Sequence, residues 1–168
     1  MRYPKTSKTR PTTDKVREAI FNVLGPVGGT VVLDLFAGTG AMAIEALSRG
    51  AQWAEFVESD REARAVLRWN LENLGLSHQA TVWAMPVCKA LPKLGSTFDI
   101  VLADPPYDFG QIDEVMDLIS RSDVLAPDGT MVLEHGKRFE PHEAYGKLRR
   151  RVLKRYGDTS VSIYEWGD

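Results

Sequence analysis

The chain has 168 residues, a length typical of a single domain with a sizeable core. Hydrophobic residues make up 43% of it and charged residues 26%, which excludes a disordered or fibrous protein. No apolar run approaches the ~18 residues that a membrane span needs, and the charged N-terminus has no apolar signal core. We therefore expect a cytoplasmic protein with one domain over residues 1–168 and a basic N-terminal arm over residues 1–13.

Cysteine and histidine are sparse. Cys88 is the only cysteine, which excludes an internal disulfide. His78, His135 and His142 are scattered, and no spacing typical of a metal site joins them to Cys88. The sequence therefore predicts no metal ion.

The formal net charge of −2 hides an uneven distribution. Residues 1–17 carry about +5 and residues 137–155 about +6, so the rest of the chain is strongly acidic. Clusters of lysine and arginine attract polyanions. The pattern indicates that a polyanion contacts both ends of the chain, and solvated surface charge is the alternative interpretation.

The first predicted element is a helix over residues 14–24, because apolar residues recur at helical spacing at positions 16, 19, 20, 23 and 24. Thr13 or Thr12 suits its N-cap, since a threonine hydroxyl accepts a hydrogen bond from the first turn. Gly25 and Pro26 end the helix.

The next segment predicts a strand over residues 31–35, a tight loop and a helix over residues 41–47. Gly38 and Gly40 permit a sharp turn and close approach of a ligand to backbone N–H groups, so a cofactor site is expected. An ordinary strand-to-helix turn is the structural alternative. Together with Ala43 the glycines also fit a loose dinucleotide fingerprint. Asp34 argues against a pyrophosphate and suits a ligand with a cationic end, such as S-adenosylmethionine.

A second strand is predicted over residues 53–57, followed by a helix over residues 61–74. In a doubly wound sheet, the end of this strand faces the same crevice as the glycine loop. Glu58 comes directly after the strand, where a carboxylate can accept hydrogen bonds from a ribose diol. Asp60 lies where a helix N-cap belongs.

The remaining elements continue the alternation of strand and helix. Strands are predicted over residues 80–84, 98–103 and 130–134. A loop over residues 85–87 leads into a short helix that ends at residue 94, and another helix is predicted over residues 111–120. A turn is predicted at Asp128-Gly129, and a closing hairpin over residues 150–156 and 160–166. This order predicts an α/β protein with a mostly parallel sheet and helices on both faces.

Asp104-Pro105-Pro106-Tyr107 follows the fourth predicted strand and is the most specific motif. Two prolines fix the backbone so that a carboxylate and rigid carbonyls face the crevice. Such a site suits an exocyclic amine. Asp104 and the Pro105 carbonyl would accept hydrogen bonds from its N–H groups. Tyr107 would stack on a base extruded from its helix. A purely structural turn is the alternative.

The glycine loop, Glu58 and this tetrapeptide together resemble class I S-adenosylmethionine-dependent methyltransferases of the amino-methylating kind. Further segments are similar to the RsmD family, bacterial enzymes that methylate N2 of a guanine in 16S ribosomal RNA. These segments are residues 10–14 with Phe21-Asn22, residues 45–51 and residues 156–159.

The resemblance implies a Rossmann-like fold with a seven-stranded sheet and a C-terminal antiparallel hairpin. It also implies a 16S ribosomal RNA substrate within the assembling small subunit, and we expect a monomer. Asp104, Pro105, Pro106 and Tyr107 would be catalytic. The predicted cofactor contacts are Arg10, Thr12, Asp34, Phe36, Ala37, Gly38, Thr39, Gly40, Glu58, Ser59, Val87 and Asp104. The predicted RNA contacts are Arg2, Lys5, Lys8, Arg10, Lys147, Arg149, Arg150 and Arg151.

Two features depart from the family pattern. Similar enzymes often carry an acid after the third strand to bind the adenine amine, and this chain has Pro86 there, which leaves the adenine to the backbone and Val87. Related chains usually carry a Gly- and Arg-rich strand pair before the Arg-Pro-Thr-Thr segment, whereas here only residues 1–9 precede it.

Three other functions remain open. A DNA adenine-N6 methyltransferase would share the tetrapeptide chemistry but generally needs a further target-recognition segment. A protein glutamine methyltransferase normally has Asn in place of Asp104. An RNA-binding module with this fold and no activity is the third.

Overall fold

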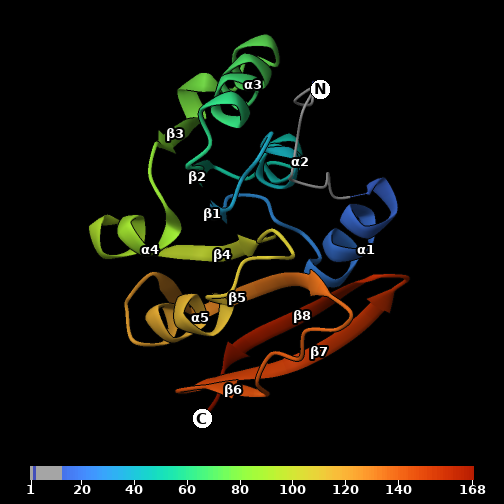
Figure 1. Ribbon diagram of the computed structural model, residues 1–168. Coiled ribbons are helices and arrows are strands. Elements are labelled where there is room, and N and C mark those ends of the chain that lie inside the picture. The colour runs from blue at the N-terminus through green and yellow to red at the C-terminus, as the bar shows by residue number, and fades with distance from the viewer. Residues whose placement is uncertain (1, 3–12) are drawn as a thin grey trace.

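The computed structural model describes Arg2 and residues 13–168 (Figure 1). Helix α1, Asp14–Leu24, begins where the Thr13 hydroxyl accepts a hydrogen bond from the Val16 N–H at 3.3 Å, so Thr13 is the N-cap. It ends at Gly25, whose positive φ of 71° is easy for a residue without Cβ. The predicted first helix is confirmed.

Eight strands form one sheet in the order β3-β2-β1-β4-β5-β8-β7-β6. The five parallel strands are β1 (Val31–Leu35), β2 (Trp53–Val57), β3 (Ala80–Trp83), β4 (Phe98–Ala103) and β5 (Leu125–Gly136). The antiparallel strands are β6 (Ala144–Tyr145), β7 (Leu148–Tyr156) and β8 (Thr159–Trp166). The predicted mostly parallel sheet with a closing hairpin is confirmed.

Helices cover both faces of the sheet (Figure 1). Helices α1, α2 (Ala41–Ser48) and α3 (Arg61–Asn73) pack on one face, and α4 (Val87–Ala90) and α5 (Ile112–Ser120) on the other. Short 3₁₀ helices cover Ser77–Gln79 and Leu91–Lys93. Successive residues of β1 serve opposite faces: Val32 packs with the first group and Leu33 with the second. A strand buried on both sides explains the continuous apolar run in the sequence.

Two details of the predicted fold are wrong. The sheet has eight strands rather than seven. The additional strand is β6, which pairs with the start of β7 across a tight turn at Gly146. A strand of two residues has no readable alternation. The turn predicted at Asp128-Gly129 lies within β5, where the register with β4 shifts between Phe98 and Ile100 and forms an irregularity.

The strand order determines where a ligand can bind. The sheet reverses its winding between β1 and β4, and in such sheets ligands bind beyond the carboxyl ends of the strands at this point. Because β8 pairs with β5 so that Thr159 opposes Gly136, the turn between β7 and β8 lies at the same end of the sheet. In the described part of the chain, no helix is both long and apolar enough to cross a membrane.

Candidate active site

The loop between β1 and α2 is tightly folded. Phe36, Gly38 and Gly40 have positive φ angles of 58°, 57° and 85°. The Ala37 N–H donates to the Val57 carbonyl at 3.0 Å, and the Gly40 N–H donates to the Ala37 carbonyl at 2.8 Å. A positive φ at Phe36 costs free energy, and such strain concentrates at functional sites. The ring of Phe36 meets that of Phe109 edge-on at 4.8 Å, so the loop contacts the segment after β4.

The two glycines have different surroundings, which gives a matched test. A Cβ at Gly40 would clash with Leu67 Cδ1, whereas a Cβ at Gly38 would meet nothing within 4 Å. Gly40→Ala combines a clash with a left-handed backbone and should cost on the order of 3 kcal/mol. Gly38→Ala should cost only about 1 kcal/mol.

Thermal unfolding measures both, at roughly 2–4 °C per kcal/mol for a chain of this size. If the loop holds a cofactor, Gly38→Ala should nevertheless weaken cofactor binding, because the added methyl group would enter open space that the cofactor needs. Equal loss of stability in the two variants would contradict the packing described here.

Four carboxylates gather at the carboxyl ends of β1, β2, β4 and β5: Asp34, Glu58, Asp104 and Glu134. Asp34 is buried, and its Oδ2 accepts a hydrogen bond from the Ala43 N–H at 3.2 Å. Burial raises the pKa of Asp34 well above its usual range, and the charges of the other three acids raise it further against that hydrogen bond. The site therefore favours a cationic ligand.

The sequence prediction did not include Glu134. It lies in β5, one strand away from Asp104, and the rule that strand ends carry functional acids could have indicated it. Among the residues that the structure describes, no group of three or more metal-ligating side chains is placed to hold a metal ion.

Glu58 and Asp60 occupy different positions. Glu58 is 7% exposed, and its two oxygens accept hydrogen bonds from the Gly38 N–H at 2.7 Å and the Asp60 N–H at 2.9 Å. Asp60 caps α3 by accepting from the Ala63 N–H at 2.8 Å, which confirms the predicted N-cap. Each carboxylate oxygen has a second lone pair. Glu58 therefore connects the glycine loop to the end of β2 and still has sites for a ligand hydroxyl.

The structure describes some of the other predicted cofactor residues and not the rest. Ala37 and Thr39 belong to the glycine loop, and Ser59 is exposed beyond β2. Val87 is the first residue of α4 and is buried. Arg10 and Thr12 lie outside the described residues. No observation assigns a ligand to any of them, so these roles stay predictions.

The tetrapeptide begins directly after β4, with Asp104 half-buried and Pro105 buried. The Phe109 N–H donates to the Pro106 carbonyl at 2.9 Å and closes the turn. Tyr107 is 54% exposed, and its ring lies against Gly136, where a Cβ would be 3.3 Å from Tyr107 Cδ1. Its hydroxyl is 3.1 Å from Thr159 Oγ1. The motif is thus held between the glycine loop and the hairpin turn.

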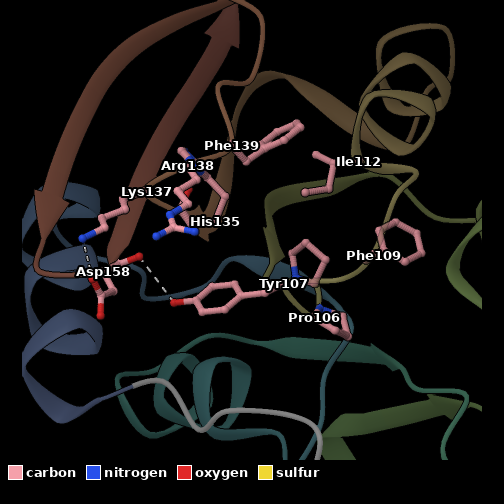
Figure 2. A pocket seen from close by; sticks show the side chains of 11 residues that line it. Pro106, Tyr107, Phe109, Ile112, His135, Lys137, Arg138, Phe139 and Asp158 are labelled. Atoms are coloured by element: carbon pink, nitrogen blue, oxygen red, sulfur yellow. Dashed lines mark hydrogen bonds and ion pairs between the residues drawn. The ribbon is translucent and has the colours of Figure 1, made fainter.

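A pocket of about 570 Å³ opens beside the tetrapeptide (Figure 2). Three of its lining residues, Pro105, Pro106 and Tyr107, come from the predicted motif. The sequence prediction missed the others, which are Phe109, Ile112, His135, Gly136, Lys137, Arg138, Phe139 and Asp158. Most of them lie at the end of β5, directly after it or in the hairpin turn. The predicted carboxyl-end crevice therefore has a second wall.

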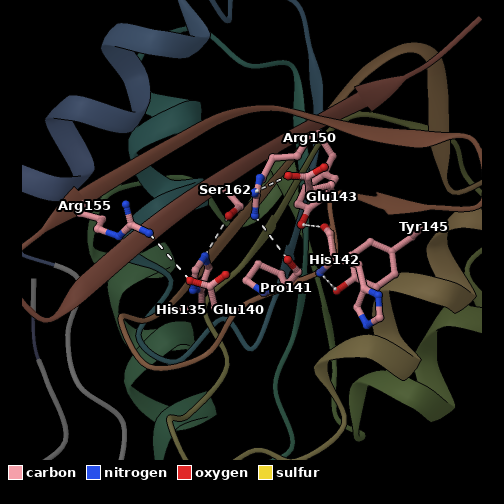
Figure 3. A network of polar contacts seen from close by, with 10 residues as sticks. His135, Glu140, Pro141, His142, Glu143, Tyr145, Arg150, Arg155 and Ser162 are labelled. Carbon is pink, nitrogen blue, oxygen red and sulfur yellow. Dashed lines mark hydrogen bonds and ion pairs between the residues drawn. The ribbon is translucent and has the colours of Figure 1, made fainter.

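His135 lines the pocket and also belongs to a network of polar contacts (Figure 3). It is 3% exposed, with Nε2 2.9 Å from Ser162 Oγ and Nδ1 3.1 Å from the Gly136 carbonyl. A carbonyl only accepts, so Nδ1 donates and Nε2 accepts from the serine hydroxyl. Burial lowers the pKa of His135, which keeps the ring neutral in this arrangement. The ring fixes the backbone that leads into the pocket.

Comparison with known proteins decides the family. Residues 1–165 match the family described as Conserved hypothetical protein 95. The chain is also 40% identical over 163 residues to a Bacillus subtilis protein named "Putative rRNA methyltransferase YlbH", covering 95% of this chain and 89% of that protein. The chain belongs to the RsmD family.

Other relatives agree with this membership in the RsmD family. "Ribosomal RNA small subunit methyltransferase D" of Escherichia coli is 38% identical over 132 residues, which span 78% of this chain and 66% of that protein. The solved structure named "Putative methyltransferase yhhF from Escherichia coli" has a TM-score of 0.85 and 31% identity, covering 95% of this chain and 89% of that chain. The fold is that of class I methyltransferases, as expected.

The predicted RNA contacts that the structure describes lie at opposite ends of the sheet of this RsmD-family chain. Arg2 is on the β2 side, where its backbone N–H donates to Asn70 Oδ1 at 2.9 Å and its guanidinium lies 3.8 Å from the Trp69 ring centroid. Lys5, Lys8 and Arg10 lie outside the described residues. The other group belongs to β7 and the turn before it: Lys147, Arg149, Arg150 and Arg151. Arg149 opposes Glu165, which opposes Thr130, so this group lies at the end of the sheet away from the crevice. The expectation that both basic segments flank the crevice mouth is therefore wrong, and RNA contact by the β7 group stays a prediction.

The β7 group is not uniform. Arg150 has a side chain only 16% exposed, donates to the Pro141 carbonyl at 3.3 Å and lies 3.8 Å from Glu143 (Figure 3). Arg151 is about half exposed and 3.9 Å from Glu165. Arg149 donates to the Gly146 carbonyl at 2.6 Å. Arg150 therefore braces the segment before β6, which leaves Lys147, Arg149 and Arg151 as the more accessible cations.

Proposed function

We propose that this protein transfers a methyl group from S-adenosylmethionine to the exocyclic N2 amine of a guanine in 16S ribosomal RNA. The observation that carries the proposal is the position of Asp104. Its charge acts on the buried Asp34 of the acidic site, and the next three residues along the chain, Pro105, Pro106 and Tyr107, line the pocket. Membership in the RsmD family and the names of its relatives support ribosomal RNA as the substrate.

The residues at the crevice fit S-adenosylmethionine. The methionine portion would lie on the backbone of Gly38 and Gly40, with the cationic groups near Asp34 and the ribose diol on Glu58. Buried acids disfavour one another, and a cation between them removes that penalty. The adenine would contact the backbone near Val87. When bound, the cofactor supplies an electrophilic methyl group on a sulfonium.

Asp34 gives a test of this arrangement. Because burial raises its pKa, its charged form destabilises the protein without ligand as pH rises through the shifted pKa. Asp34→Asn keeps an acceptor for the Ala43 N–H and should raise the unfolding temperature at neutral pH. The same change should weaken S-adenosylmethionine binding by roughly tenfold or more, the size of a lost charged hydrogen bond. Calorimetry measures both, and tighter binding by the variant would refute a cationic ligand at Asp34.

The proposed chemistry uses few protein groups. The lone pair of the guanine amine is delocalised into the ring, so acceptors on its N–H bonds favour the tetrahedral nitrogen of the transition state. Asp104 and the Pro105 carbonyl would be these acceptors. The amine nitrogen would form a bond to the methyl carbon as the bond from that carbon to sulfur breaks, which would leave a neutral thioether, and Asp104 or water would take the amine proton.

Tyr107 should act mainly through its ring. Tyr107→Ala should impair methylation strongly, because a base in the pocket would lose its stacking surface, worth ~1–3 kcal/mol. Tyr107→Phe should be mild, although it loses the contact between the hydroxyl and Thr159. Steady-state kinetics on RNA compare the two. An inactive Tyr107→Phe enzyme would instead assign the hydroxyl a role in proton transfer or hydrogen bonding.

Substitution in the RNA tests the N2 assignment. Once the modified nucleotide is mapped, an RNA with inosine at that position lacks the 2-amino group and should accept no methyl group. Adenosine at the same position should also fail. Methyl transfer to the inosine RNA at the same nucleotide would exclude N2 as the acceptor.

A further inference from the structure

The pocket beside Tyr107 has an uneven charge balance at its mouth. The lining residues that carry a formal charge at neutral pH are exposed there: Lys137, Arg138 and Asp158. Lys137 Nζ lies 2.8 Å from Asp158 Oδ1, so these two charges compensate each other. Arg138 is exposed and forms no ion pair within the described part of the chain. The mouth of the pocket therefore has an excess positive charge at Arg138.

The inner walls have a different character. They are apolar, which suits the faces of a flat ring (Figure 2). The apolar lining residues are Pro105, Pro106, Phe109, Ile112 and Phe139. A nucleotide whose base entered these walls would keep its charged phosphates outside, because an apolar wall cannot replace their hydration. The phosphates would then lie at the mouth, where Arg138 extends.

Arg138 is carried on a fixed piece of backbone. The Lys137 N–H donates to the Asp158 carbonyl at 3.0 Å, and the Phe139 N–H donates to the Gly136 carbonyl at 3.2 Å. His135 anchors the same segment to Ser162 at 2.9 Å. These bonds hold both neighbours of Arg138 and restrict where its guanidinium reaches, which reduces the ordering cost of binding.

We propose that Arg138 is a phosphate-binding residue of the substrate site and holds a phosphodiester next to the nucleotide that enters the pocket. This inference rests on the proposed function. The planar guanidinium binds a phosphate through two parallel hydrogen bonds, which a lysine cannot reproduce. Arg138 thus fixes the backbone of the extruded nucleotide while the tetrapeptide contacts its base. The contact orients RNA without reading its sequence.

The first test is RNA binding without cofactor across a salt series. Arg138→Ala should weaken binding roughly tenfold and lower the salt slope by roughly 0.7–0.9, the value for one lost phosphate contact. Arg138→Lys should keep most of the slope. The control is Arg121→Ala, which removes an exposed arginine at the C-terminal end of α5, away from the carboxyl ends of the strands. S-adenosylmethionine affinity should be unchanged in all three variants.

The second test locates the contact. A neutral methylphosphonate at a phosphate flanking the mapped target should weaken binding to the wild type but not further to Arg138→Ala. If Arg138→Ala matches Arg121→Ala in slope and affinity while the wild type methylates RNA, Arg138 binds no phosphate and the proposed function stands. If the wild type itself neither binds nor methylates RNA, both proposals fail.

Discussion

Replacing Asp104 with alanine should reduce turnover by orders of magnitude while S-adenosylmethionine affinity stays within a few fold. The reason is that the carboxylate would hold the target amine chiefly as its nitrogen becomes tetrahedral, and interactions made only in the transition state change kcat. Removing one such acceptor or donor in a preorganised site typically costs 10²–10³ in rate, roughly 3–4 kcal/mol. Single-turnover methyl transfer measures the rate, and isothermal titration measures the affinity.

Two further variants make this result specific to Asp104. Asp104→Asn retains one carbonyl acceptor and should keep more activity than Asp104→Ala. Asp108→Ala removes an exposed carboxylate four residues further along and should leave the rate nearly unchanged. A cofactor affinity that falls as much as the rate would assign Asp104 to cofactor binding instead of to the amine.

Glu58→Ala should weaken S-adenosylmethionine binding by ~1–3 kcal/mol, because the ribose diol would lose a charged acceptor in a buried site. Its loss also frees the Gly38 N–H, which Glu58 holds at 2.7 Å, and loosens the glycine loop. Both the lost acceptor and the looser loop should lower the affinity for the cofactor. Titration calorimetry with the cofactor checks the affinity.

Asp60→Ala is the matched control, because it removes a neighbouring carboxylate that caps a helix. Its loss should cost about 1 kcal/mol of stability, the usual value of a helix N-cap, and lower the unfolding temperature with little change in cofactor affinity. Asp60 accepts from the Ala63 N–H and caps α3. If Asp60→Ala proved the costlier change for cofactor binding, the ribose assignment to Glu58 would be wrong.

The central sheet was predictable because its strands are buried on both faces. The predicted bounds of β1, β2 and β4 agree with the structure, since each strand is a short apolar run between turn residues. The rule about carboxyl ends predicted the acids at and after these strands, and the structure brings Asp34, Glu58 and Asp104 near one another. Glu134 was not predicted because it lies inside the fifth strand rather than in the loop after it, and only the folded sheet shows that its charge acts on Asp34.

The second wall of the pocket could not be predicted in the same way. Gly136 and Thr159 are far apart in sequence and meet only because β8 pairs antiparallel with β5. Until that pairing is known, no local pattern connects Tyr107 to the hairpin turn. The charge run on β7 was visible, but not which cations are free, because an irregularity between Arg150 and Val152 shifts the alternation.

The most direct measurement of the central claim is methyl transfer from labelled S-adenosylmethionine to three acceptors in parallel: 16S ribosomal RNA, assembling 30S particles and DNA, followed by mapping of the modified base. We predict label in ribosomal RNA, free or within the particle, at N2 of a single guanine, and none in DNA. Label that appears only in DNA, or in no acceptor despite cofactor binding, would contradict a ribosomal RNA methyltransferase.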